Sequence, residues 1–126
     1  MTPEDFSRAF AYAFGDQNAA ALADLMAEDG TAQTLTGLWA EGREAARAAF
    51  DAEATGIFAR ARLVTGKGNV LPLGLDVALL RQRFVVTGAI EETGAEMPRF
   101  GAMLVAVLQS DGLNWRAVSL TFTLLA

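Results

Sequence analysis

The sequence predicts one α+β domain in which three helices precede a mostly antiparallel sheet. Apolar residues recur at helical spacing through most of residues 1–56, whereas the remainder alternates or runs apolar over strand-length stretches. Helices and strands that are segregated along a chain are typical of α+β domains. The chain has 126 residues, 52% of them hydrophobic, and no linker or internal repeat, so 1–126 can bury a single core.

Three helices are expected, over 3–14, from a cap at Asp16 onward, and over 42–56. Thr2 and Pro3 suit the start of the first helix. Each helix has apolar residues at helical spacing: Phe6, Phe10 and Phe14, then Leu22, Leu25 and Met26, then Ala46, Phe50 and Ala54.

The strands are expected mainly after residue 56. One short strand is predicted over 31–36, after a turn at 29–30 and before a loop over 37–42. The later strands are predicted over 57–67, 76–87, 99–109 and 115–125. The glycine-rich segment 66–69 is expected to be a turn, and the acidic segment 91–96 a hairpin loop.

The expected strand 99–109 has no polar face, because residues 102–108 are all apolar. The last strand instead alternates apolar and hydroxyl-bearing residues over 118–124, as a strand with one buried face does. Helices can cover only one face of 99–109. Unless the chain's own loops cover the other face, the sequence predicts a homodimer through the sheet face.

The composition excludes several chemistries. The chain has no cysteine and no histidine, which excludes disulfides, thiolate nucleophiles, Ser-His-Asp triads and sites built on those ligands. No dinucleotide, flavin or carboxylate metal-loop motif occurs, so no cofactor or metal is expected. Fifteen acidic residues against ten basic ones give a net charge of -5, so nucleic acid is not an expected partner.

The longest apolar run is far shorter than the roughly 20 residues that a membrane-spanning helix needs. The N-terminal segment 1–5 is acidic, where a secretion signal would be basic. A cytoplasmic location without membrane association is therefore expected.

Several segments resemble the nuclear transport factor 2-like superfamily: AALADLMAEDG at 20–30, GLWAEGRE at 37–44, LDVALL at 75–80 and NWR at 114–116. Within it, the sequence is most similar to the SgcJ/EcaC branch of uncharacterised, SnoaL-like proteins. The resemblance implies a cone-shaped roll, with a strongly bent sheet curled around the first helix. It also implies a pocket at the open end of the cone and dimerisation through the outer face of the sheet.

The aromatic residues on the expected helix stripes and strand faces predict that this pocket binds a small, mostly apolar molecule. Its candidate lining residues are Phe10, Thr34, Thr36, Trp39, Phe50, Phe84, Met103 and Phe122. Trp39 could be a lid over the ligand or a plug at the end of the cone. Two alternatives stay open: a cofactor-independent isomerase, cyclase or dehydratase, and a dimeric assembly module with a filled cone.

Ketosteroid isomerases of this superfamily use an aspartate base, a tyrosine and a protonated aspartic acid. The resemblance places these roles at Thr34, near Arg8 and within 102–105, where the residues cannot perform them. Isomerase chemistry of that type is therefore not expected. For a dehydratase or cyclase, Asp76 is the remaining acidic candidate, with a solvated turn residue as the alternative.

Two sets of charged residues are candidates for ion pairs or anion binding. Asp29 and Arg43 are expected to form a structural ion pair between the turn at 29–30 and the third helix. Arg60 and Arg62, like Arg81 and Arg83, are two residues apart and so share a strand face. If adjacent strands align them, the four form an anion site or a surface that faces solvent or a dimer partner.

Overall fold

The computed structural model describes residues 1–125 and contains three α-helices and a six-stranded sheet. After the 3-10 turn η1 (Pro3–Asp5), the helices are α1 (Phe6–Gly15), α2 (Ala19–Asp24) and α3 (Arg43–Ala54). The strands are β1 (Met26–Gln33), β2 (Trp39–Glu41), β3 (Arg62–Pro72), β4 (Val77–Thr87), β5 (Phe100–Ser110) and β6 (Trp115–Leu124).

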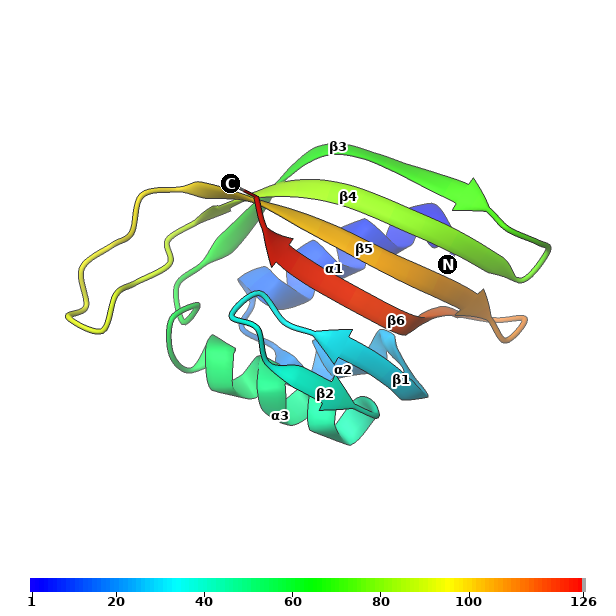
Figure 1. Cartoon of the computed structure of the whole chain (residues 1–126), viewed down its shortest axis with the longest axis horizontal. Helices are drawn as coiled ribbons and strands as arrows, with labels where there is room; N and C mark the ends of the chain where they lie inside the picture. The colour runs from blue at the N-terminus through cyan, green and yellow to red at the C-terminus, as the bar shows by residue number, and fades with distance from the viewer. Residues whose placement is uncertain (126) are drawn as a thin grey trace.

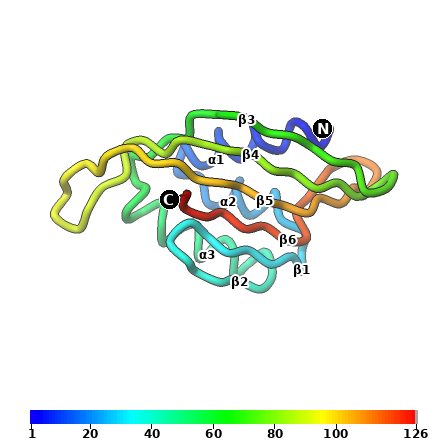
Figure 2. The backbone as a smooth tube through the Cα atoms, turned by 45° about the horizontal axis from the view of Figure 1, so that its top comes forward, coloured from blue at the N-terminus to red at the C-terminus, as the bar shows by residue number. Residues whose placement is uncertain are grey.

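The strand order of the sheet is β2-β1-β6-β5-β4-β3, and all neighbours are antiparallel except β1 and β6. The helices lie on one side of the sheet, which curves around α1 (Figure 1). The β4–β5 hairpin loop projects beyond the rest of the molecule (Figure 2). The predicted α+β fold, with helices first and a mostly antiparallel sheet, is confirmed.

Phenylalanines of α1 fill the space between the helices and the sheet. The ring centre of Phe10 lies 6.2 Å from that of Phe84 on β4 and 5.3 Å from that of Phe122 on β6. The ring centre of Phe14 lies 5.3 Å from that of Phe58, which precedes β3. Such pairs stabilise a core beyond the burial of their area. The residues that predicted helix 3–14 therefore also attach it to the sheet.

The central strands have an inner face against the helices and an outer face turned away from them. On β5 every second residue is buried: Ala102, Leu104, Ala106 and Leu108. The outer face carries Leu79, Arg81, Arg83 and Val85 of β4, Met103, Val105 and Val107 of β5, and Ser119, Thr121 and Thr123 of β6. No element of residues 1–125 covers it (Figure 1).

The turn expected at Asp29-Gly30 is wrong, because both residues lie inside β1, which begins well before the predicted strand 31–36. β1 runs parallel to β6 and shifts register within this stretch. A Cβ on Gly30 would lie 2.6 Å from the carbonyl oxygen of Ala117 on β6. Glycine here permits a close approach between strands rather than a reversal of the chain.

The second helix is shorter than expected. Asn18 caps it instead of Asp16, since Asn18 Oδ1 accepts a hydrogen bond from the N–H of Ala21 at 3.0 Å. Met26, expected on the helix, is the fully buried first residue of β1. The expected loop 37–42 contains the short strand β2, which pairs with β1.

β3 lies further along the chain than the predicted strand 57–67. It runs through the glycine-rich segment 66–69, which is a bulge and not the expected turn. The side-chain amide of Gln82 donates to the carbonyl oxygen of Gly66 at 2.9 Å. A Cβ on Gly68 would collide with that amide. Glycines therefore make room for a buried polar side chain beside the bulge.

Candidate functional site

The interior of the fold is filled by side chains that were expected to line a pocket. Phe10, Phe84 and Phe122 pack on one another, and Phe50 of α3 is also buried. The enclosed space that remains beside Phe50 is about 10 Å³, enough for about one water molecule. These four phenylalanines are core residues, and within residues 1–125 they do not form the wall of a ligand-sized cavity.

Three other expected pocket residues point elsewhere. Thr34 is fully buried, and its hydroxyl oxygen accepts a hydrogen bond from the N–H of Leu38 at 3.1 Å, which caps the β1–β2 turn. Trp39 is 61% exposed, its Nε1 donates to Glu41 Oε1 at 3.1 Å, and its pairing with Gln33 places it on the outer face, so it neither covers nor plugs the interior. Met103 lies on the outer face. Alternation along a strand separates Met103 from the core.

Thr36 forms the contact of most chemical interest. Its backbone N–H donates to Glu53 Oε2 at 3.0 Å, and its hydroxyl donates to the same oxygen. Glu53, in the last turn of α3, is only 6% exposed, and its Oε1 accepts no hydrogen bond within residues 1–125. A buried carboxylate requires such donors to offset its lost hydration.

The sequence-based reasoning missed Glu53. Ala46, Phe50 and Glu53 follow one another at helical spacing, and all three are buried on the inward side of α3. A carboxylate in the apolar stripe of a helix is unusual, since Glu is rarely buried without a partner. That position in the stripe is the signal that marks Glu53.

Beside this pair lies an open groove of about 680 Å³, which we call the rim groove. It lies where the β1–β2 turn, the segment after α3 and the β4–β5 hairpin meet. The last two are joined by a hydrogen bond from the N–H of Ile90 to the carbonyl oxygen of Ile57 at 3.0 Å. Its lining residues are Thr36, Thr55, Gly56, Ile57, Ala59, Ile90, Glu91 and Glu92. The groove thus joins an apolar floor to an acidic edge.

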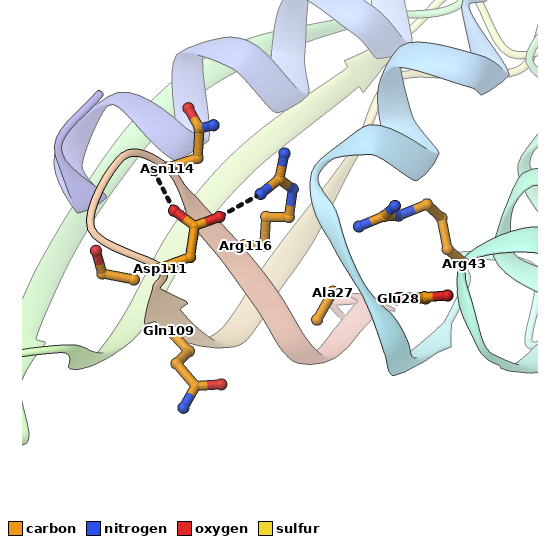
Figure 3. A pocket seen from close by; sticks show the side chains of 8 residues that line it. Ala27, Glu28, Arg43, Gln109, Asp111, Asn114 and Arg116 are labelled. Atoms are coloured by element: carbon orange, nitrogen blue, oxygen red, sulfur yellow. Dashed lines mark hydrogen bonds and ion pairs between the residues drawn. The ribbon is translucent and has the colours of Figure 1, made fainter.

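A second cleft, of about 220 Å³, lies at the opposite ends of the strands and contains two arginines (Figure 3). Arg116 donates to Asp111 Oδ2 at 2.9 Å and to the carbonyl oxygen of Asp24 at 3.2 Å. The pKa of Asp111 is lowered because the backbone N–H groups of Asn114 and Leu113 donate to its carboxylate, with a further contribution from the Arg116 charge. These contacts join the β5–β6 turn to the end of α2.

The expected ion pair between Asp29 and Arg43 is not formed. Arg43 instead donates from Nε and Nη2 to the carbonyl oxygen of Met26, at 3.0 and 2.9 Å. The one ion pair within residues 1–125 is Arg116–Asp111. Because the bulged start of β1 offers a carbonyl oxygen to the guanidinium, Arg43 links α3 to the backbone of β1 rather than to a carboxylate.

The four strand arginines do not gather on one face. Arg81 and Arg83 lie on the outer face with Lys67, around a hollow of about 300 Å³. Arg62 lies beside α1, where it lines a cleft with Tyr12, and Arg60 precedes β3. The register separates the two pairs along the strands, because Arg62 lies opposite Thr87 whereas Arg81 lies opposite Asn69.

Within the described residues, no group of three or more Asp or Glu side chains is placed to hold a metal ion. Across the same residues, no helix is long and apolar enough to cross a membrane.

No family model matches this chain, and no curated protein matches it. Among solved structures, an uncharacterised protein with a cystatin-like fold from Caulobacter vibrioides has a TM-score of 0.85 at 18% identity, covering 98% of this chain and 87% of that one. A ketosteroid isomerase-like protein from Erwinia carotovora atroseptica has a TM-score of 0.82 at 14% identity, covering 98% and 93%. A candidate calcium/calmodulin dependent protein kinase II association domain from Xanthomonas campestris has a TM-score of 0.81 at 18% identity, covering 97% and 84%.

The chain therefore has the cystatin-like fold of nuclear transport factor 2-like proteins, as the resemblance implied. Similarity at this level of identity shows the fold alone, and the matching proteins differ in what they are described to do. The similarity to the SgcJ/EcaC branch stays a prediction.

Proposed function

We propose that this chain is a self-associating binding domain that works through the outer face of its sheet. The observation that carries the proposal is the half-buried apolar strip of Met103, Val105 and Val107 on β5, which no element of residues 1–125 covers. Leu79 and Val85 flank it on β4. An apolar strip bordered by polar side chains is typical of a protein interface.

The side chains that border the strip on β6 are small, which favours close packing of a second sheet. Ser119, Thr121 and Thr123 carry small side chains beside it on β6. Two sheets pack face to face at about 10 Å when their side chains can interdigitate. The similarity in fold to a candidate kinase association domain supports an assembly role, and the filled interior supports it over an internal ligand pocket.

Sedimentation velocity at tens of micromolar protein tests this function. We expect a dimer, and we expect Val105→Glu to give a folded monomer because it places a charge in the centre of the strip. Leu75→Glu is the matched control, since Leu75 is 96% exposed in the β3–β4 turn. A monomeric wild-type protein, or a dimer that tolerates Val105→Glu, would overturn the proposal.

A second candidate function, binding of a small molecule, is favoured by the rim groove and not by the core. Its volume of about 680 Å³ is within the range of ligand sites, and Ile57 and Ile90 supply an apolar surface. Glu53 and the edge residues Glu91 and Glu92 favour a ligand with a positive charge. The cofactor-independent enzyme alternative depends on the same groove, since Glu53 is the buried carboxylate beside it.

Isothermal titration with octylamine and octanol tests this second candidate. We expect saturable binding of the amine, weaker binding of the alcohol, and loss of both in Ile90→Arg. Leu113→Arg is the control, because Leu113 is exposed in the β5–β6 turn at the other end of the strands. Absence of saturable binding, or equal effects of the two variants, would exclude this role of the groove.

A further inference from the structure

The outer face carries opposite charges at its two edges. Lys67, Arg81 and Arg83 lie on the β3–β4 side, whereas Glu41 lies on β2 at the other edge of the sheet. None of the four takes part in the one ion pair that residues 1–125 form. On a chain with a net charge of -5, three cations without a carboxylate partner in the protomer are available for an external one.

The register of the sheet places Trp39 and Glu41 on the same face as these cations. The row of directly opposed residues is Trp39, Gln33, Thr121, Val105, Arg81 and Asn69. Opposed residues share a face of the sheet. Four strand steps of about 4.8 Å separate Trp39 from Arg81 by roughly 19 Å, too far for contact within one protomer.

Trp39 has the properties of an interface anchor. Its side chain is exposed at the edge of the outer face, and its indole N–H is bound to Glu41 Oε1 at 3.1 Å, which orients the two side chains together. Exposed tryptophans of this kind dominate the energy of many interfaces. The opposite edge offers a hollow of about 300 Å³, whose lining residues are Lys67, Gly68, Asn69, Arg81, Arg83 and Met103.

Building on the self-association proposed above, we infer that the Trp39–Glu41 edge of each copy docks into the cationic hollow of the other. A two-fold axis parallel to the strands places β2 of one copy opposite β3 and β4 of its partner. It also keeps each row of opposed residues at the same position along the strands. The indole of Trp39 then meets the partner's Arg81, and the Glu41 carboxylate, which the indole N–H holds beside the ring, meets the same guanidinium. The symmetry forms this contact twice.

The dimer dissociation constants of charge variants test this docking. We expect Trp39→Ala, Glu41→Lys and Arg81→Glu each to raise the constant about tenfold or more, since each removes a contact that the symmetry forms twice. Combining Glu41→Lys with Arg81→Glu should recover part of the loss, which a folding defect would not do. Glu44→Lys makes the same change of charge at an exposed position of α3 and should leave the constant unchanged.

Fluorescence locates Trp39 directly, because Trp39 and Trp115 are the two tryptophans and a Trp115→Phe variant isolates it. Diluting the protein from above to below the dimer dissociation constant should shift the emission of Trp39 to longer wavelength. If the protein dimerises but the emission does not shift and Trp39→Ala leaves the dimer dissociation constant unchanged, the docking is overturned. The self-association would then remain intact. A wild-type monomer would instead overturn the self-association on which the docking depends.

Discussion

Thr36 donates two hydrogen bonds to a single carboxylate oxygen of Glu53, one from its backbone N–H at 3.0 Å and one from its hydroxyl. The two residues are 17 positions apart and belong to the β1–β2 turn and the last turn of α3. Because Glu53 is almost fully buried, the contact both stabilises the carboxylate and holds the turn against the helix. It also fixes the position of Thr36 in the rim groove.

Replacing Thr36 by valine should destabilise the fold by about 2 kcal/mol, because a buried carboxylate loses one of its two donors. Urea unfolding at neutral pH measures the loss. Thr55→Val is the control, since the Thr55 hydroxyl donates to the Asp51 carbonyl oxygen at an exposed site; its effect should stay within about 0.5 kcal/mol. Equal losses in the two variants would mean that the Glu53 contact adds nothing.

Truncating Phe122 to alanine should cost about 3–5 kcal/mol and leave a cavity among the remaining phenylalanines. Because the wild-type core is filled, benzene should raise the melting temperature of the variant and not that of the wild type. Phe122→Leu should be destabilised less and should not respond to benzene. A wild-type protein that responds as strongly as the variant would show that the interior already has room for a ligand.

Arg43→Met should destabilise the fold by about 2 kcal/mol, because the carbonyl oxygen of Met26 loses two hydrogen bonds from a charged donor. Asp29→Asn should change the stability by less than about 0.5 kcal/mol, since Asp29 forms no ion pair with Arg43. Chemical denaturation of both variants distinguishes the two arrangements. Comparable losses of stability in the two variants would instead support the Asp29–Arg43 ion pair expected from the sequence.

Acid should remove the contribution of Asp111 to stability. The pKa of its carboxyl is lowered from 3.8, first by the N–H groups of Asn114 and Leu113 and then by Arg116. A carboxyl with a folded-state pKa below its unfolded value stabilises the fold above the unfolded pKa, and this is lost as the pH falls through the folded pKa.

The difference in melting temperature between wild type and Asp111→Asn should therefore shrink between about pH 5 and about pH 2. Thermal unfolding across that range measures it, and Arg116→Gln should show a smaller change of the same sign. A difference that is constant with pH would contradict the assigned cause.

Much of the fold could be predicted from local patterns. The strands predicted over 76–87, 99–109 and 115–125 agree with β4, β5 and β6 to within a residue or two, because their apolar patterns and flanking turns are local signals. Two of the errors occur at 29–30 and 66–69, where glycines permit close backbone approach between strands instead of turns. Sequence alone shows that glycine is present and not which neighbour requires it.

The candidate site was less accessible to prediction. An apolar pattern shows that Phe10, Phe84 and Phe122 face inward, but only three-dimensional packing shows whether they leave a cavity. The apolar outer face, in contrast, could be predicted from the sequence, because the apolar run of β5 is uninterrupted. Trp39 is neither the lid nor the plug that a loop over 37–42 predicts, because its segment forms the strand β2 and pairs with β1.

The edges of the sheet limit how this protein can aggregate. β2 has only three residues, and β3 is interrupted by a bulge and carries Lys67 and Pro72. A short strand, a bulge, a lysine and a proline each hinder the addition of another strand. Growth of open-ended fibres by edge-to-edge pairing is therefore disfavoured, whereas pairing through the faces by a two-fold axis closes after two copies.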